Sequence, residues 1–320
     1  MDLNYWWVHT PAKINITLEV LGKRADGYHG IRSLMLPIAL YDTLRLDIPP
    51  RLANENNSQL QLDCYWSEQF FTGRKLDCYD TKTSDSSLPG RESLPTDHHN
   101  LVYRAVELLR KKTGFLQDLR LTLCKRIPTQ AGLGGGSSDA AAALVLVNQA
   151  CRLGLDCRTL QEWGAEIGSD VPFFISPEPA VVEGRGEKKV SISGVPRLHW
   201  ILIKPRVALS TAAVYRRFEL MAGEPRATVD FTSAATAALL TGDVCLLGKN
   251  MHNDLESAAH VLAAEIGTIK DELRQAGCMT QLMSGSGSSF FGLARSARHA
   301  RKIAGRLQAR GLGQVWALQN

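Results

Sequence analysis

The sequence lacks the long apolar segments that mark membrane and secreted proteins. None of its apolar runs approaches the roughly 20 residues that a membrane-spanning helix needs. The first residues, MDLNYWWVHTPAK, lack the basic stretch followed by an apolar stretch that is typical of a secretory signal. The sequence therefore predicts a protein that neither crosses nor binds a membrane.

Paired cysteines and a strong net charge are also lacking. The seven cysteines are scattered, with no CxxC pair and no histidine partner at zinc-site spacing. We expect reduced thiols, which are typical of the cytoplasm. The net charge of +5 suits an anionic small ligand as well as nucleic acid. Short basic clusters such as Lys111-Lys112 are not interleaved with aromatic residues, so we expect no nucleic-acid partner.

The patterns that are present predict an α+β fold. Strand-like alternation occurs at 6–21 and 314–318, whereas helical spacing of apolar residues occurs at 100–114, 139–148 and 260–275.

Changes in residue composition along the chain also suggest its domain organisation. We place a boundary near residue 196, which gives domains 1–195 and 196–320. The polar stretch at about 67–97 interrupts the first domain and is predicted to be a surface insertion.

The strongest local signal is PTQAGLGGGSSDAAAAL, at residues 128–144. Glycines let backbone N–H groups approach a ligand, and the start of the following helix favours an anion. The segment is neither a Walker loop nor a GxGxxG motif, and a simple helix cap would need only one glycine. It therefore predicts a phosphate-binding loop of another type. The loop proper consists of Gly132, Leu133, Gly134, Gly135, Gly136, Ser137 and Ser138.

This loop resembles the second signature of the GHMP small-molecule kinases. Three more segments resemble that family and follow its order: PAKINITLEVLGKRADGYHGIRSL (11–34), IGSDVPFF (167–174) and MSGSGSSFFGL (283–293). Only the region near 67–97 has no counterpart. The resemblance implies a two-domain fold, with an N-terminal domain like domain 2 of ribosomal protein S5 and a ferredoxin-like C-terminal domain.

The resemblance implies an ATP-dependent kinase that uses Mg²⁺ and phosphorylates an alcohol. The family's catalytic pair falls on Lys13 and Asp170, with Asp170 as the base for the substrate hydroxyl and Lys13 as the cation that holds it. The metal would be held through ATP by Ser137 or Ser138, without a protein cage. Outside this context, Asp170 would be interpreted as a helix cap and Lys13 as an exposed strand lysine.

The segments are most similar to the branch of the family that phosphorylates a cytidine diphosphate alcohol in isoprenoid (terpenoid) biosynthesis. The resemblance implies that Tyr28 and His29 recognise the cytidine base and that Tyr215 closes its other face, although core packing explains Tyr215 equally well. The remaining residues carried over to the substrate side are Asn15, Thr211, Gly285, Ser286 and Gly287. Asn100 is a weaker candidate for the adenine side.

Two other functions remain open from the sequence. The chain could be another kinase of the family, acting on mevalonate, homoserine or a sugar, or a non-catalytic nucleotide-binding protein of the same fold. Both a monomer and a homodimer are compatible with the sequence.

Overall fold

The structure is a computed structural model that describes residues 5–25, 27–49, 58–67, 93–221 and 229–320. Most of the predicted insertion at 67–97 lies outside these residues.

The chain forms two compact units that are interleaved in sequence. Unit 1 comprises residues 1–11, 40–129 and 135–176, and unit 2 comprises residues 12–39, 130–134 and 177–320. The predicted boundary near residue 196 divides the chain differently and stays a prediction.

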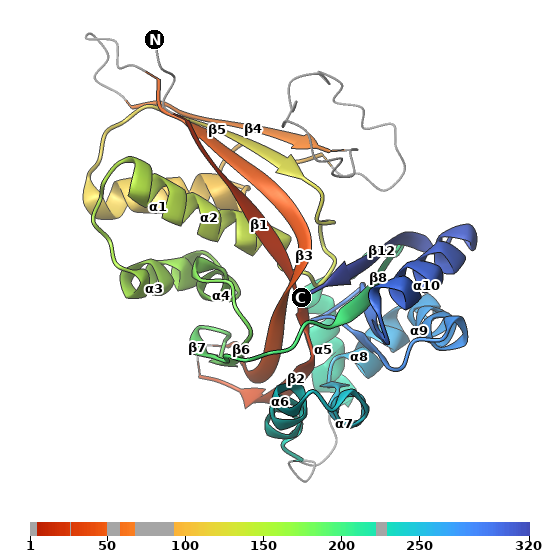
Figure 1. Cartoon of the computed structure of the whole chain (residues 1–320). Coiled ribbons are helices and arrows are strands. Elements are labelled where there is room, and N and C mark those ends of the chain that lie inside the picture. The colour runs from red at the N-terminus through yellow and green to blue at the C-terminus, as the bar shows by residue number, and fades with distance from the viewer. Residues whose placement is uncertain (1–4, 26, 50–57, 68–92, 222–228) are drawn as a thin grey trace. The chain divides into compact units, whose positions relative to one another are not determined.

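Runs of strands and runs of helices follow one another along the chain (Figure 1). The strands are β1 (Tyr5–Asn15), β2 (Thr17–Lys23), β3 (His29–Asp47), β4 (Leu60–Trp66), β5 (Leu119–Lys125), β6 (Ala180–Gly184), β7 (Lys188–Ser191), β8 (His199–Pro205), β9 (His252–Asn253), β10 (Gln281–Met283), β11 (Phe290–Ala294) and β12 (Gly313–Gln319). The helices are α1 (Leu101–Thr113), α2 (Gly135–Ala150), α3 (Cys157–Ile167), α4 (Val171–Ile175), α5 (Thr211–Met221), α6 (Phe231–Thr241), α7 (Val244–Asn250), α8 (Glu256–Leu262), α9 (Glu265–Ala276) and α10 (Ala297–Ala309).

Unit 1 contains a sheet with helices packed beside it. The second half of β3 pairs with β5 in antiparallel register, with Leu44 opposite Leu123, and β5 pairs with β4 in parallel register. Helices α1 and α2 pack against each other, and α3 and α4 pack against α2 (Figure 1). The apolar sequence of α2 is thus explained by neighbours on several sides.

Two helix predictions in unit 1 are confirmed, and one boundary is corrected. Asn100 caps α1 by accepting a hydrogen bond from Val102 N, and Gly114 ends the helix in the left-handed region, as its position predicts. Helix α2, however, begins at Gly135 rather than near Asp139. The first N–H groups of a helix have no partner within it, so the glycine-serine segment can form this turn while its N–H groups remain available to a ligand.

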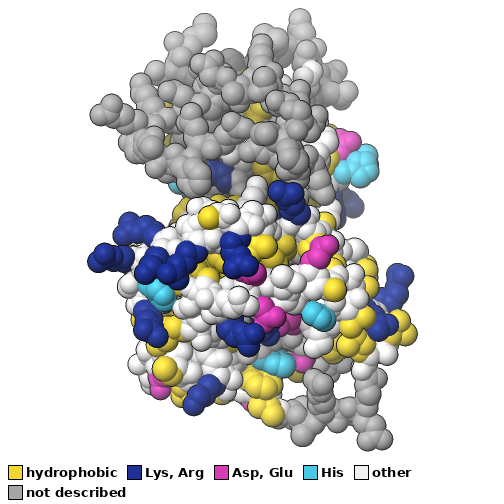
Figure 2. Space-filling model, turned by 90° about the vertical axis from the view of Figure 1, so that its right-hand side faces the viewer, with side chains coloured by type: hydrophobic (Ala, Val, Ile, Leu, Met, Phe, Trp, Pro, Cys, Tyr) yellow, Lys and Arg dark blue, Asp and Glu magenta, His cyan; other side chains and the backbone are white. Residues whose placement is uncertain are grey.

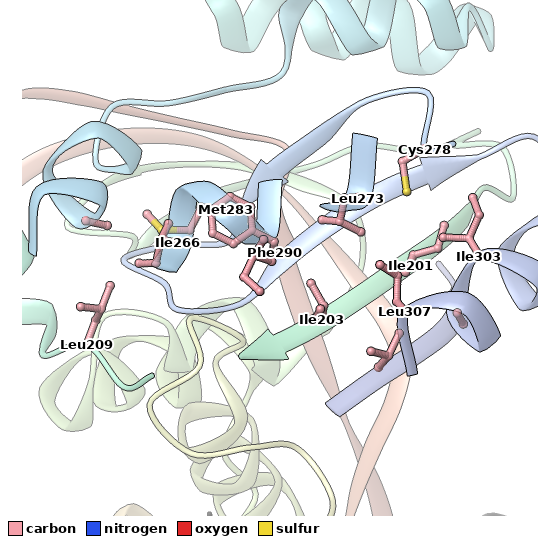
Figure 3. Packing of buried hydrophobic residues seen from close by; sticks show 14 of the residues in the cluster. Ile201, Ile203, Leu209, Ile266, Leu273, Cys278, Met283, Phe290, Ile303 and Leu307 are labelled. Carbon is pink, nitrogen blue, oxygen red and sulfur yellow. The ribbon is translucent and has the colours of Figure 1, made fainter. Parts of the chain in front are cut away.

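The carboxy-terminal part of unit 2 is built on an antiparallel sheet with the strand order β10-β11-β8-β12. Helices α9 and α10 pack against this sheet. Side chains of the sheet and of these helices form a buried apolar core (Figure 3), whose members include Ile201, Ile203, Ile266, Leu273, Met283, Phe290, Ile303 and Leu307.

The remaining strands of unit 2 include a pairing that the sequence did not reveal. The two-residue strand β9 pairs in parallel with β2, with Thr17 opposite His252. The predicted helix at 260–275 is wrong as a single element, because α8 ends at Leu262 and α9 begins at Glu265. Ala263, between them, has an extended backbone with φ −148° and ψ 99°, and no proline or glycine signals this break.

No helix in the described ranges is long and apolar enough to cross a membrane. Figure 2 shows one face of the molecule, on which several Lys and Arg side chains gather toward the upper left of the described part and others are scattered among apolar and uncharged atoms.

Replacing Leu273 by Ala tests the core of unit 2. Leu273 is fully buried, so Leu273→Ala should lower the free energy of unfolding by about 2–5 kcal/mol. Leu220→Ala is the matched control, because Leu220 is 74% exposed and its loss should change stability by less than about 0.5 kcal/mol. Urea denaturation followed by circular dichroism measures both variants, and equal stabilities would contradict the assignment of this core.

Candidate active site

The phosphate loop (residues 132–138) is divided between the two units, so each part is described by itself. In unit 2, Gly132 and Gly134 have φ values of 73° and 70°, in the left-handed region that favours glycine. Between them, Leu133 accepts a hydrogen bond at 3.0 Å from the backbone N–H of Lys13. The loop is thereby tied to the strand that carries the predicted catalytic lysine.

A second small-residue segment, the serine turn (residues 284–289), lies against the same part of the loop. Ser284 Oγ donates to the Gly132 carbonyl at 3.0 Å, and Ser289 N donates to the Ala131 carbonyl at 3.2 Å. A Cβ on Gly132 would lie 2.0 Å from the Ser284 carbonyl oxygen. Only glycine fits there, so the close approach predicted for the two glycine-rich segments is present within unit 2.

Lys13 and Asn15 lie on one face of β1, as the alternation predicts. Lys13 Nζ donates to Asn15 Oδ1 at 2.6 Å, and Asn15 Nδ2 donates to Ser33 Oγ at 2.8 Å. Lys13 is 3% exposed and Asn15 is 1% exposed, so neither is an ordinary surface residue. A buried ammonium group held by an amide oxygen is oriented for a defined contact, whereas a surface lysine samples many rotamers.

Two of the predicted base-binding residues, His29 and Tyr215, lie together elsewhere in unit 2, whereas Tyr28 lies against Arg185. The rings of His29 and Tyr215 are stacked with their centroids 5.0 Å apart, and His29 Nε2 lies 3.1 Å from Glu219. Tyr28 is 54% exposed, and the Arg185 guanidinium lies 5.0 Å from its ring centroid. Tyr28 therefore presents an accessible ring, whereas Tyr215 packs partly on the core of unit 2.

Thr211 and Ser286 are directly connected. Their hydroxyl oxygens lie 2.8 Å apart, which links the start of α5 to the serine turn. Gly285 and Gly287 in this turn have φ values of 57° and 86°. The predicted substrate residues of the turn and Thr211 thus occupy one place in unit 2.

Asn253 is a residue of this region that the sequence analysis missed. Its Nδ2 donates to the carbonyls of Met283 and Gly285 at 2.8 Å each, and its Oδ1 accepts from Leu255 N at 2.9 Å. Asn253 is buried and holds the start of the serine turn. No sequence signal marks this role, because the turn that Asn253 holds lies about 30 residues further along the chain.

In unit 1, the first turn of α2 contains Gly135, Gly136, Ser137 and Ser138. Ser138 Oγ is buried and has no hydrogen-bond partner among the described residues. A buried hydroxyl without a partner is costly, and a ligand oxygen or metal ion at this helix start would satisfy it. The turn therefore fits a Mg²⁺-bound phosphate group.

Asp170 occupies the N-cap position of the short helix α4, as its helix-cap interpretation expects, but its side chain makes no capping hydrogen bond. Asn100, by contrast, uses its polar atoms structurally: Oδ1 caps α1, and Nδ2 donates to the Pro95 carbonyl at 2.7 Å. A contact of Asn100 with adenine stays a prediction.

Unit 1 also contains a buried ionic cluster that the sequence analysis missed, which we call the acid–lysine network (Asp42, Lys125 and Asp139). Lys125 Nζ donates to Asp42 and, at 2.7 Å, to Asp139 Oδ2. Asp139 Oδ1 accepts from Thr10 Oγ1 at 2.8 Å, and Asp42 Oδ1 accepts from Ile127 N at 2.8 Å. These residues are far apart in sequence, so only the fold reveals the cluster.

Opposing effects set the charges in this network. Burial and the nearby charge of Asp139 raise the pKa of Asp42 to about 7, although Lys125 and backbone N–H groups favour its ionised form. Burial lowers the pKa of Lys125, but the two carboxylates outweigh burial and raise it above its usual range. Lys125 therefore stays protonated at neutral pH.

Comparisons with known proteins show the family and the fold of the chain. Residues 100–178 match the GHMP kinases N-terminal domain, and residues 235–312 match the GHMP kinases C-terminal domain. A homoserine kinase from Cytophaga hutchinsonii superposes with a TM-score of 0.71 over 99% of this chain and 95% of that one, at 19% identity, which shows the shared fold. The two matched domains and the shared fold identify the chain as a GHMP-type small-molecule kinase.

Relatives with higher sequence identity show which group of these kinases the chain belongs to. The 4-diphosphocytidyl-2-C-methyl-D-erythritol kinases of Pelotomaculum thermopropionicum and Moorella thermoacetica are each 37% identical to this chain; the matches cover 92% of this chain in both cases, and 91% and 92% of the relatives. A crystal structure of 4-(cytidine 5'-diphospho)-2C-methyl-D-erythritol kinase has a TM-score of 0.74 at 30% identity and 98% coverage of both chains. The chain belongs to the 4-diphosphocytidyl-2-C-methyl-D-erythritol kinase family.

Replacing Gly132 by Ala tests the contact between the loop and the serine turn. The new Cβ would collide with a backbone carbonyl at a positive φ, so Gly132→Ala should weaken ATP binding at least tenfold. Gly305→Ala is the matched control, because Gly305 lies in α10, outside the loop, and a Cβ there meets no atom within 4 Å. Calorimetric titration with ATP compares them, and wild-type affinity in Gly132→Ala would contradict the described geometry.

Proposed function

We propose that this protein transfers the γ-phosphoryl group of ATP to the 2-hydroxyl of 4-diphosphocytidyl-2-C-methyl-D-erythritol, giving the 2-phosphate and ADP. This reaction belongs to the methylerythritol phosphate route of isoprenoid biosynthesis. The observation that carries the proposal is the buried Lys13–Asn15 pair, whose strand is bonded to the phosphate loop. Near full-length similarity to kinases of that name supports the choice of substrate.

In the proposed mechanism, the chain binds and orients both reactants. The phosphate loop holds the triphosphate through backbone N–H groups at the start of α2. Asp170 takes the proton from the substrate hydroxyl as the oxygen attacks the γ-phosphorus, and ADP leaves. Lys13, oriented by Asn15, stabilises the negative charge at the transferred group.

The proposed cofactor role of Mg²⁺ rests on the start of α2. Ser138, with its unpartnered hydroxyl, and Ser137 would hold the ion together with the phosphates of ATP. When bound, the ion neutralises phosphate charge.

On the substrate side, Tyr28, His29 and Tyr215 are proposed to bind the cytosine ring. Thr211 and the serine turn, with Gly285, Ser286 and Gly287, are proposed to border the diphosphate, because glycine allows backbone groups to approach it closely. Asn100 is proposed as a minor contact on the adenine side.

We further propose that the protein works in the cytoplasm. None of the described cysteines forms a disulfide, which suits a reducing compartment. The molar mass in solution, measured by analytical ultracentrifugation, distinguishes a monomer from a homodimer.

Variants of the proposed catalytic pair test the mechanism. Asp170→Asn and Lys13→Met should each lower kcat by about 10²–10⁴-fold, because the first removes the base and the second removes the charge at the transfer point. A coupled ADP-release assay with ATP and the cytidyl alcohol measures the effect. Asp271→Asn, in the exposed Asp271–Arg274 pair of α9, is the matched control and should keep wild-type activity.

The same assay with mevalonate and homoserine distinguishes this function from those of other family members. Turnover of either compound in preference to the cytidyl alcohol would overturn the proposed substrate. Unchanged activity in both Asp170→Asn and Lys13→Met would overturn the proposed mechanism.

Tyr28 gives a separate test of the substrate. Tyr28→Ala removes an exposed ring, so the KM for the cytidyl alcohol should rise about tenfold or more while the KM for ATP stays near the wild-type value. Tyr41→Ala is a matched control, since Tyr41 is also exposed but lies in unit 1. Equal changes in both KM values would argue against recognition of cytosine by Tyr28.

A further inference from the structure

The acid–lysine network joins the two ends of the segment that contains the phosphate loop. Lys125 is the last residue of β5, and Asp139 lies just after the first turn of α2. Their ion pair therefore closes a segment whose ends are 14 residues apart, with the phosphate loop inside it. An ion pair at the base of a loop restricts where the loop can begin and end.

The network also lies directly beside the first residue of α2. A Cβ on Gly135 would lie 3.2 Å from Lys125 Nζ and 2.8 Å from Ile127 Cγ2. Ile127 and Arg126 in turn donate their backbone N–H groups to Asp42. Asp42 thus fixes the chain just after β5, while Lys125 and Asp139 fix the start of α2.

We propose that Asp42, Lys125 and Asp139 are positioning residues that hold the first turn of α2 in the geometry that binds the triphosphate. This inference rests on the proposed function, since it assigns the network to ATP binding. None of the three residues contacts substrate in this account. Their loss should weaken ATP binding much more than it changes the KM for the cytidyl alcohol.

The charge of the network gives the inference a second consequence. The groups facing Asp42 are Lys125 at the end of β5, Arg126 just after it, Asp139 on α2 and His9 on β1. Cys64 on β4 also interacts electrostatically with Lys125 and Asp139. Because burial raises the pKa of Asp42 to about 7, a rise in pH through this range adds one negative charge beside Lys125, next to the first residue of α2. ATP binding should therefore weaken as pH rises through this range.

The test measures the dissociation constant of Mg-ATP by calorimetry, which requires no acceptor substrate. Lys125→Met should raise this constant at least tenfold, but it also leaves buried carboxylates without a cation, and that defect alone destabilises the fold. The decisive variant is therefore Lys125→Met/Asp42→Asn/Asp139→Asn, which contains no buried charge in the network. Arg310→Met, which breaks the remote Arg310–Glu272 pair, is the control.

The inference predicts that the triple variant unfolds at a temperature close to that of the wild type yet binds Mg-ATP at least tenfold more weakly. A purely structural network would instead give wild-type affinity once the fold is retained, and that result would overturn the inference. If the triple variant does not fold, the inference is tested by the pH dependence of Mg-ATP affinity in the single variant Asp42→Asn. The affinity of the wild type should fall between pH 6 and 8 more steeply than that of Asp42→Asn, and identical profiles would overturn the inference.

The protonation of ATP changes with pH in the same way for the wild type and for Asp42→Asn, so its effect on affinity cancels when the two profiles are compared. The proposed function fails in a different way. If the protein binds Mg-ATP with the predicted pattern but does not phosphorylate the cytidyl alcohol, the positioning role of the network stands and the proposed substrate is wrong.

Discussion

The close approach of Gly132 to Ser284 is the constraint on which the site in unit 2 depends. Two segments about 150 residues apart meet there with no room for a Cβ atom. Their backbones hydrogen-bond through Ala131 and Ser289, and the loop is also bonded to the strand of Lys13 through Leu133. One backbone contact thus fixes the phosphate loop, the serine turn and the proposed catalytic lysine together.

Two buried amide side chains around these segments, Asn15 and Asn253, are each held by partners that define their direction. Asn15 accepts a hydrogen bond from Lys13 and donates one to Ser33, while Asn253 holds the serine turn by donating to two backbone carbonyls at its start. Burial makes an unpaired polar group costly, so these contacts restrict the segments to one arrangement. Phosphoryl transfer depends mainly on alignment and charge neutralisation, and such rigid support serves that need.

The parts of this protein that could be predicted from sequence are those with local signals. Asn100 and Gly114 mark the ends of α1, the alternation in β1 places Lys13 beside Asn15, and the glycine-serine run marks the phosphate loop. The break at Ala263 has no such signal, because an ordinary residue adopts the extended backbone there. The acid–lysine network was also hidden, since Asp42 and Lys125 meet only after strands distant in sequence have paired.

The central claim is that the phosphate loop holds ATP for transfer to the 2-hydroxyl of the cytidyl alcohol. The most direct measurement is ³¹P NMR of the wild-type protein incubated with Mg-ATP and 4-diphosphocytidyl-2-C-methyl-D-erythritol. The account predicts that a new phosphomonoester signal appears in step with ADP, while the diphosphate signals of the alcohol persist. Formation of ADP with inorganic phosphate alone, or no change in the spectrum, would contradict it.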